Sequence, residues 1–403
     1  MHFQRKGIVF FKRNQNFSSK NLQSQKKPLI LHPQSNGKHS GAIAQLVEQR
    51  TENPCVPGSI PGGTTRNPSS PRGVFYFQEM PIFGFSKNAH GMKLQTPVQT
   101  EPLTEGFTYK DRILFIGSCF AENIGNLCSS NYMHTMVNPM GILFNPCSIA
   151  DCLGIIDGYG INPYGCSFTE ADAIQTPAGY CSFHHHGSFA RPTAAEFVQN
   201  ANAELAKASE FVQQARWVVV TLGTAFVYRT EDGMPVSNCH KLPGSMFTRT
   251  MLTPEQAADA IEQYIGADPE RQWILTVSPV RHMTDGMHQN QLSKATLLMA
   301  VEILKSRYPN VHYFPSYEIM LDELRDYRFY TEDMAHPSAQ ATQYIWERFM
   351  EFGLQPDQRQ ILQRAQHIRQ QMEHRILNPG TEQASAFIRH RQEALEQFLA
   401  EIE

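Results

Sequence analysis

Uninterrupted apolar runs constrain the fold of this chain more than any other feature. They are ILFI at residues 113–116, WVVVTLGTAFVY at 217–228, QWILTVSPV at 272–280 and, more weakly, VHYFPSYEI at 311–319. Strands that are buried on both faces lack the alternation of apolar and polar residues, and such strands are typical of parallel sheets. We therefore expect these four runs to be strands of one parallel sheet.

Helical segments separate the runs. Apolar residues recur at helical spacing in 194–215, 253–267 and 292–308, and Thr253 with Gln256 forms a capping box at the start of the second segment. Strands that alternate with helices predict an α/β fold, in which helices cover both faces of a parallel sheet.

Two further segments do not follow this alternation. Residues 147–193 are rich in Gly, Cys, Phe and His and are predicted to form a long irregular insertion. From residue 356 the composition shifts to Gln, Arg and Glu, and apolar residues near helical spacing predict a helical hairpin over 356–403. This hairpin either packs on the domain or forms a homodimer with a second copy, and the pattern does not distinguish the two.

Residues 1–91 differ in composition from the rest of the chain. They carry 12 Lys and Arg against 3 Asp and Glu, whereas the remainder carries 23 against 35. They lack periodicity and predict disorder. Within residues 42–65, AIAQLVEQRTENPCVPGSIPGG resembles the peptide obtained when a transfer-RNA gene is translated by mistake. We therefore expect the true protein to start near Met92, with a domain over 92–355 and the helical extension after it.

The composition excludes several classes of protein. No run reaches the 18 apolar residues of a membrane span, and no signal peptide is recognisable. Eight cysteines without a CxxC pair indicate reduced thiols, so we expect a cytoplasmic protein. The acidic main body argues against a nucleic-acid partner. FHHHGSF at 183–189 has no neighbouring carboxylate or CxxC, so we expect neither a metal nor a cofactor.

Two short motifs carry candidate catalytic residues. In FIGSCFAENIG, Ser118 and Cys119 follow a strand and begin a helix, which places a nucleophile at the ligand-binding edge of the sheet. Backbone N–H groups at a helix N-terminus stabilise a thiolate or an oxyanion. In DMAHPS, Asp333 and His336 lie three residues apart, a spacing that suits an orienting carboxylate and a general base.

The motifs FIGSCFAENIG, NPMGILFNP, TLGTAFVY, NCHKLP, SPVRHMTDG and YEIMLDELRDYRFYTEDMAHPS occur in this order. Between about residues 93 and 345 the chain resembles the GSCFA family, a branch of the SGNH/GDSL hydrolase superfamily. The resemblance implies a flavodoxin-like three-layer α/β/α sandwich with a nucleophile after the first strand. It also implies that Asp333 and His336 complete the catalytic machinery.

The resemblance also assigns roles to single residues. The first block of the superfamily has its nucleophile two positions after Gly, which favours Cys119, and Ser118 stays the alternative. We expect the helix N-terminus and His336 to lower the pKa of Cys119. Gly141 is the implied backbone oxyanion donor. The usual third donor is an Asn, but Thr224 follows Gly223 here, so the candidates are the Thr224 hydroxyl and Asn238. Candidate substrate-binding residues are His240, Lys241, Arg281 and His282.

These observations together predict a hydrolase that acts on an acyl ester through a covalent acyl-enzyme. The implied substrate is a small-molecule or carbohydrate ester. One alternative is an acyltransferase to a sugar or small alcohol acceptor. The other is a non-catalytic ligand-binding module that retains the fold.

Overall fold

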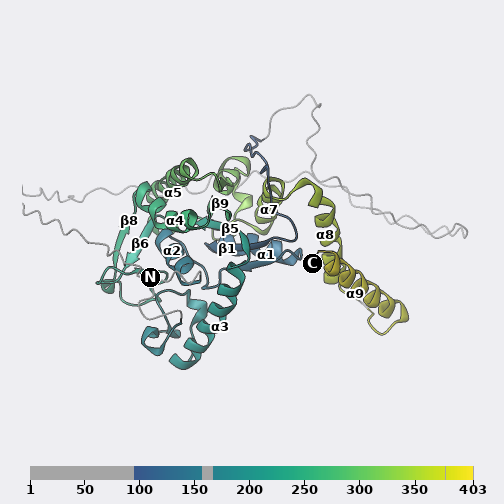
Figure 1. Ribbon diagram of the computed structural model, residues 1–403, viewed down its shortest axis with the longest axis horizontal. Coiled ribbons are helices and arrows are strands. Elements are labelled where there is room, and N and C mark those ends of the chain that lie inside the picture. Colours follow the sequence, from purple (N-terminus) through teal and green to yellow (C-terminus); the bar gives the residue numbers. More distant parts are fainter. Residues whose placement is uncertain (1–94, 157–166, 377, 403) are drawn as a thin grey trace, which may run out of the picture. The chain divides into compact units, whose positions relative to one another are not determined.

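Five parallel strands form the central sheet (Figure 1). A computed structural model describes residues 95–156, 167–376 and 378–402, so the predictions for residues 1–91, including the translated transfer-RNA gene, lie outside it. In order across the sheet, the strands are β10 (Val311–Tyr313), β9 (Gln272–Val277), β5 (Ala215–Leu222), β1 (Arg112–Gly117) and β2 (Thr135–Val137). Counted along the chain this order is 2-1-3-4-5, the flavodoxin-like doubly wound arrangement.

The two faces of the sheet explain why its strands read as continuous apolar runs. Successive side chains of a strand point to opposite faces. In β1, Leu114 and Ile116 pack into one buried cluster, whereas Ile113 and Phe115 pack into the cluster on the other face. Both faces are covered, so neither set of positions is polar.

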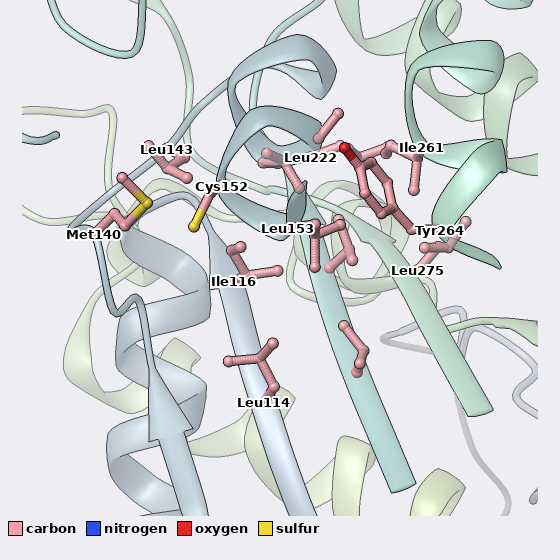
Figure 2. Packing of buried hydrophobic residues seen from close by; sticks show 14 of the residues in the cluster. Leu114, Ile116, Met140, Leu143, Cys152, Leu153, Leu222, Ile261, Tyr264 and Leu275 are labelled. Carbon is pink, nitrogen blue, oxygen red and sulfur yellow. The ribbon is translucent and has the colours of Figure 1, made fainter. Parts of the chain in front are cut away.

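Helices cover both faces. The first is covered by α2 (Pro146–Ile156), α3 (Ala194–Val212), α4 (Pro254–Ala267) and α5 (Met287–Arg307). Figure 2 shows this packing, with Leu153 of α2 and Tyr264 of α4 among Ile116, Leu222 and Leu275 of the strands. The second face is covered by α1 (Cys119–Ser130) and α7 (Ala339–Gly353). The predicted three-layer α/β/α sandwich is confirmed. In the described ranges, no helix has the length and apolar character that crossing a bilayer requires.

The predicted C-terminal hairpin consists of α8 (Arg359–Glu373) and α9 (Glu382–Ile402), after a short 3-10 helix at Pro356–Gln358 (Figure 1). Its buried residues join the cluster under α1 and α7. The Phe398 ring lies 6.2 Å from the ring centroid of Tyr109 and 5.7 Å from that of Tyr132. The hairpin therefore packs on the domain, and the homodimer stays a prediction.

One predicted strand is wrong in its second half. WVVVTLGTAFVY contains the end of β5 and then β6 (Phe226–Arg229), which belongs to a separate antiparallel sheet with β7 (Pro235–Val236) and β8 (Thr248–Met251). The N–H groups of Gly223 and Thr224 both donate to the carbonyl of Phe144, at 2.8 Å each. Because a distant loop takes these donors, the chain leaves the sheet at Gly223.

Other boundaries also differ from those predicted. The run 311–319 is a strand only as far as Tyr313, and α6 (Ser316–Glu318) and a π-helix (Ile319–Glu323) follow it. Helix α5 begins at Met287 rather than at 292. The predicted insertion begins with α2 and contains a hairpin of β3 (Ile174–Thr176) and β4 (Gly179–Cys181). The remaining short elements are 3-10 helices at Glu170–Asp172, Gly187–Phe189, Gly244–Met246, Met283–Asp285 and Tyr327–Phe329.

Candidate active site

The candidate site lies at the carboxyl edge of the sheet, where β1 ends at Gly117. This residue has φ +135°, and a Cβ there would lie 2.2 Å from the carbonyl oxygen of Thr221 in β5. Only glycine permits this close approach of two backbones. The side-chain oxygen of Asn138, in the loop after β2, accepts the Gly117 N–H at 2.9 Å. These contacts turn the chain out of the sheet and start α1.

The structure gives Ser118 and Cys119 different environments. Ser118 is 1% exposed, and its hydroxyl accepts the N–H of Phe120 at 3.2 Å as the N-cap of α1. Such a cap contributes about 1 kcal/mol to helix stability. Cys119 is the first residue of α1 and is partly exposed. Ser118 therefore has a structural role, and Cys119 is the more accessible side chain of the pair.

The expected low pKa of the Cys119 thiol is wrong. Burial raises this pKa, and the carboxylate of Glu122 raises it further. The N–H groups of Cys119 and Phe120 at the helix N-terminus lower it, as does the charge of Lys294, but burial outweighs them. The helix N-terminus acts in the predicted direction without being the dominant influence.

Asp333 and His336 form the predicted pair. His336 Nδ1 lies 2.6 Å from Asp333 Oδ2, and both side chains are exposed. Asp333 Oδ1 accepts the Thr331 hydroxyl at 2.6 Å and the N–H groups of His336 and Ala335 at 3.0 and 2.8 Å. These bonds, that of Thr331 foremost, hold the pKa of Asp333 well below its usual range. A carboxylate at Nδ1 leaves Nε2 as the basic nitrogen.

Arg281 holds the loop that carries this pair. Its guanidinium lies 3.8 Å from the ring centroid of Tyr330 and donates to the carbonyl of Met334 at 3.3 Å. Its backbone N–H donates to the carbonyl of Ala335 at 3.1 Å. These contacts dock the loop 331–338 against the segment that follows β9. The binding of an anionic substrate group by Arg281 stays a prediction.

His282 lies between the exposed pair and the interior. Its pKa is lowered to about 4, chiefly by burial and then by the charges of Lys294, His336 and Arg249, against a hydrogen bond with Gly223 that raises it. Lys294 in turn acts on Cys119. The charge of Lys294 therefore influences both His282 and Cys119, whereas that of His336 influences His282. Within the described ranges, no hydrogen bond joins the His336 ring to Ser118 or Cys119.

The predicted oxyanion donors are engaged in internal hydrogen bonds. The N–H of Gly141 donates to the Asn138 carbonyl at 2.7 Å. The Thr224 N–H donates to the Phe144 carbonyl, and its hydroxyl lies 3.1 Å from that of Ser293. Gly141 has φ +81°, and a Cβ there would lie 2.4 Å from the Cβ of His186. In this arrangement the backbone N–H groups of both residues are already engaged within the protein.

Asn238 and His240 brace a loop. The side-chain oxygen of Asn238 accepts the N–H of His240 at 2.8 Å. His240 is buried, with φ +49°, and its Nε2 donates to the carbonyl of Ser182 at 2.8 Å. Burial lowers the pKa of His240. Lys241, the next residue, is exposed.

The three adjacent histidines have separate partners. His184 bonds to Asp151, buried His185 lies 2.7 Å from the hydroxyl of Ser182, and His186 lies beside Gly141. Burial lowers the pKa of His185 to about 3. Across the residues that the structure describes, no group of three or more His, Cys, Asp or Glu side chains could hold a metal ion.

Sequence reasoning missed the contribution of α5. Asn290 accepts the N–H of His282 at 3.0 Å, and the Ser293 hydroxyl accepts the N–H of Ala225 at 2.7 Å. Lys294 Nζ donates to the carbonyls of Gly223 and Ser278, at 2.7 Å each. The available signal was polar residues at core positions of a helix, since 290, 293, 294 and 297 share one helical face.

Comparison with known proteins bears on the family of the chain. No curated protein matches it. The model of the GSCFA family matches residues 112–349, which span more than half of the 403 residues and include both candidate catalytic motifs. The chain therefore belongs to the GSCFA family.

Proposed function

We propose that the protein is an acyl hydrolase of the SGNH type that works through a covalent acyl-enzyme on Cys119. The observation that carries the proposal is the 2.6 Å contact between Asp333 and His336, on a loop docked at the same sheet edge as the start of α1. An orienting carboxylate on Nδ1 leaves Nε2 as the general base that a nucleophile requires.

The proposed cycle uses these groups in two steps. His336 takes the thiol proton, and the sulfur of Cys119 attacks the carbonyl carbon of an ester. The bond from this carbon to the alcohol oxygen breaks, and the alcohol leaves with the proton from His336. In the second step His336 takes a proton from water, and the water oxygen attacks the thioester carbon. The carbon–sulfur bond then breaks, the acid leaves, and the sulfur of Cys119 regains the proton from His336. Backbone N–H groups at the start of α1 stabilise the negative charge of each tetrahedral intermediate.

The arrangement also favours Cys119 over Ser118 in this role. The Ser118 hydroxyl is buried and already accepts the N–H of Phe120, whereas the Cys119 side chain is partly exposed. Transfer of the acyl group to a sugar or small alcohol needs the same residues, with the acceptor hydroxyl in place of water. The two reactions differ only in the second step.

A panel of acyl esters, including acylated sugars, tests the proposal on the purified chain. We expect turnover that Cys119→Ala and His336→Ala abolish, and an acyl adduct on Cys119 in the intact mass. Ser118→Ala should lower stability more than activity. Products formed with and without a sugar acceptor separate hydrolysis from transfer. Ligand-induced thermal stabilisation without turnover of any ester would instead indicate a binding module.

A further inference from the structure

Lys294 is the most unusual charged residue among those that the structure describes. It projects from α5 into the interior, is 1% exposed, and ends between the carbonyls that follow β5 and β9. No carboxylate forms an ion pair with it in the described part of the chain. Lysine is almost never fully buried unless it is paired, so its burial here points to a specific requirement.

The hydrogen bonds fix both the position and the direction of this amine. An ammonium group has three N–H donors and no acceptor, and two of the donors go to Gly223 and Ser278 at 2.7 Å. The Tyr317 ring lies 5.8 Å away on another side. Gly223 and Ser278 both lie at the carboxyl edge of the sheet. Gly223 follows β5, two residues after Thr221, whose carbonyl accepts the N–H of Ser118 at 3.1 Å, and Ser278 follows β9, the neighbour of β5 on its other side. The charge is therefore held under the edge at which Cys119 begins α1.

We propose that Lys294 is the buried counter-charge of the Cys119 thiolate and positions the negative charge that forms there. This inference rests on the proposed function, in which Cys119 is the nucleophile. When the S–H bond breaks, the proton moves to Nε2 of His336 as in the proposed cycle. Lys294 keeps its three protons, and its positive charge stabilises the negative charge left on the sulfur. The charge of Lys294 lowers the pKa of Cys119, and the charge of Cys119 raises the pKa of Lys294.

Other titratable groups face this pair. The carboxylate of Glu122 in α1 raises the pKa of Cys119 and so disfavours the thiolate. His282 lies in the segment after β9, and the charge of Lys294 helps to lower its pKa. Burial lowers the pKa of Lys294 to about 7, against the influence of Cys119. The cation therefore predominates only below about pH 7, and deprotonation above that pH removes its support for the thiolate.

The test is the pH dependence of Cys119 alkylation by iodoacetamide, read by peptide mass spectrometry because the chain has eight cysteines. Lys294→Met should raise the pKa of the Cys119 thiol by about one pH unit, which slows alkylation at pH 7 about tenfold. Lys294→Gln should do the same, because it keeps a hydrogen-bond donor but not the charge. Lys305→Met, in the same helix but exposed and paired with Glu302, should leave the profile unchanged.

The outcomes separate a charge effect from a structural one. A Lys294→Gln profile equal to that of the unaltered protein would overturn the proposal, because hydrogen bonding alone would then explain Lys294. So would an unchanged profile in a folded Lys294→Met variant. Lys294→Gln alone decides the question if the Met variant fails to fold. Alkylation needs no ester, so a shifted profile without turnover would support the charge pair and refute only the proposed function.

Discussion

Replacing Glu323 by Gln should destabilise the protein strongly, because this carboxylate collects three donors from two distant parts of the chain. Its side chain is 1% exposed. Oε2 accepts the N–H of Val98 at 2.9 Å, and Oε1 accepts Arg348 at 2.6 Å together with the hydroxyl of Tyr344. Gln has one acceptor oxygen, so its NH₂ group would face a donor, and the charge opposite Arg348 would be lost.

The structure sets the size of the effect. Removing one partner of a buried ion pair costs about 3–5 kcal/mol. Here Arg348 keeps bonds to the Val98 carbonyl at 2.8 Å and to the Thr100 hydroxyl at 3.1 Å, and Gln keeps one acceptor. We therefore expect a loss of about 2–3 kcal/mol in the free energy of unfolding.

Glu351 provides a matched control for the same arginine. Its carboxylate lies 3.3 Å from Nε of Arg348, but its side chain is 65% exposed. Exposed pairs contribute about 0–1 kcal/mol, so Glu351→Gln should lower the free energy of unfolding by less than about 1 kcal/mol. Urea denaturation of both variants measures the difference. Equal losses would refute the reasoning, since burial would then not decide the value of the pair.

Three further predictions address the site, the pH response and the C-terminal helices. Asp333→Asn should keep the fold and lower kcat on the order of 10³- to 10⁴-fold by presenting the wrong imidazole tautomer. Asp285→Asn should lower it far less, and equal losses of turnover would show that the pair is misassigned. Lowering the pH from 7.5 to 5 should cost about 2 kcal/mol through His185. Its folded pKa of about 3 lies below the ordinary value, so its contribution is complete above about pH 6.5 and is lost as the pH falls. His185→Asn should flatten the stability profile measured by urea titration at each pH, and an unaltered slope would contradict this. Phe398→Ala should cost about 3–5 kcal/mol of unfolding free energy, because Phe398 is fully buried. Leu399→Ala, at a residue that is 37% exposed, should cost under about 1 kcal/mol, and similar losses would mean that α9 does not pack on the domain.

The architecture could be predicted because the residues that make the sheet are neighbours in sequence. Ile113 to Ile116 and Trp217 to Val220 are apolar on both faces, and this pattern alone indicates buried parallel strands. The errors occurred where a distant group ends a strand. Nothing in WVVVTLGTAFVY shows that the Phe144 carbonyl will take the N–H groups of Gly223 and Thr224.

In the candidate site, too, contacts between residues close in sequence could be predicted and contacts between distant segments could not. Asp333 and His336 are three residues apart, so their contact follows from local spacing. The oxyanion donors were assigned from the resemblance and depend on loops from different parts of the chain. The carbonyl of Asn138 accepts the N–H of Gly141 within the motif NPMGILFNP, whereas the Thr224 hydroxyl lies against that of Ser293, 69 residues further along the chain, a pairing that no single motif contains. Helix α5 was predicted over 292–308, but its role at the site was missed, because the first half of its inner face carries polar residues that bind loops whereas only the second half is apolar.

The pKa of Cys119 shows why correct local reasoning can still fail. The helix N-terminus lowers this pKa as expected, and Glu122, one turn along the same helix, raises it. Both influences are visible in the sequence and oppose each other. What decides the result is burial, which depends on how distant segments pack around the start of α1, among them the loop after β2, whose Leu143 N–H donates to the Gly117 carbonyl at 2.8 Å. A thiol desolvated in this way needs a positive charge from outside its own helix before it can act as a nucleophile near neutral pH. The proposed counter-charge, Lys294 on the inner face of α5, would supply this charge, and on that proposal α5 bears most directly on whether Cys119 can react.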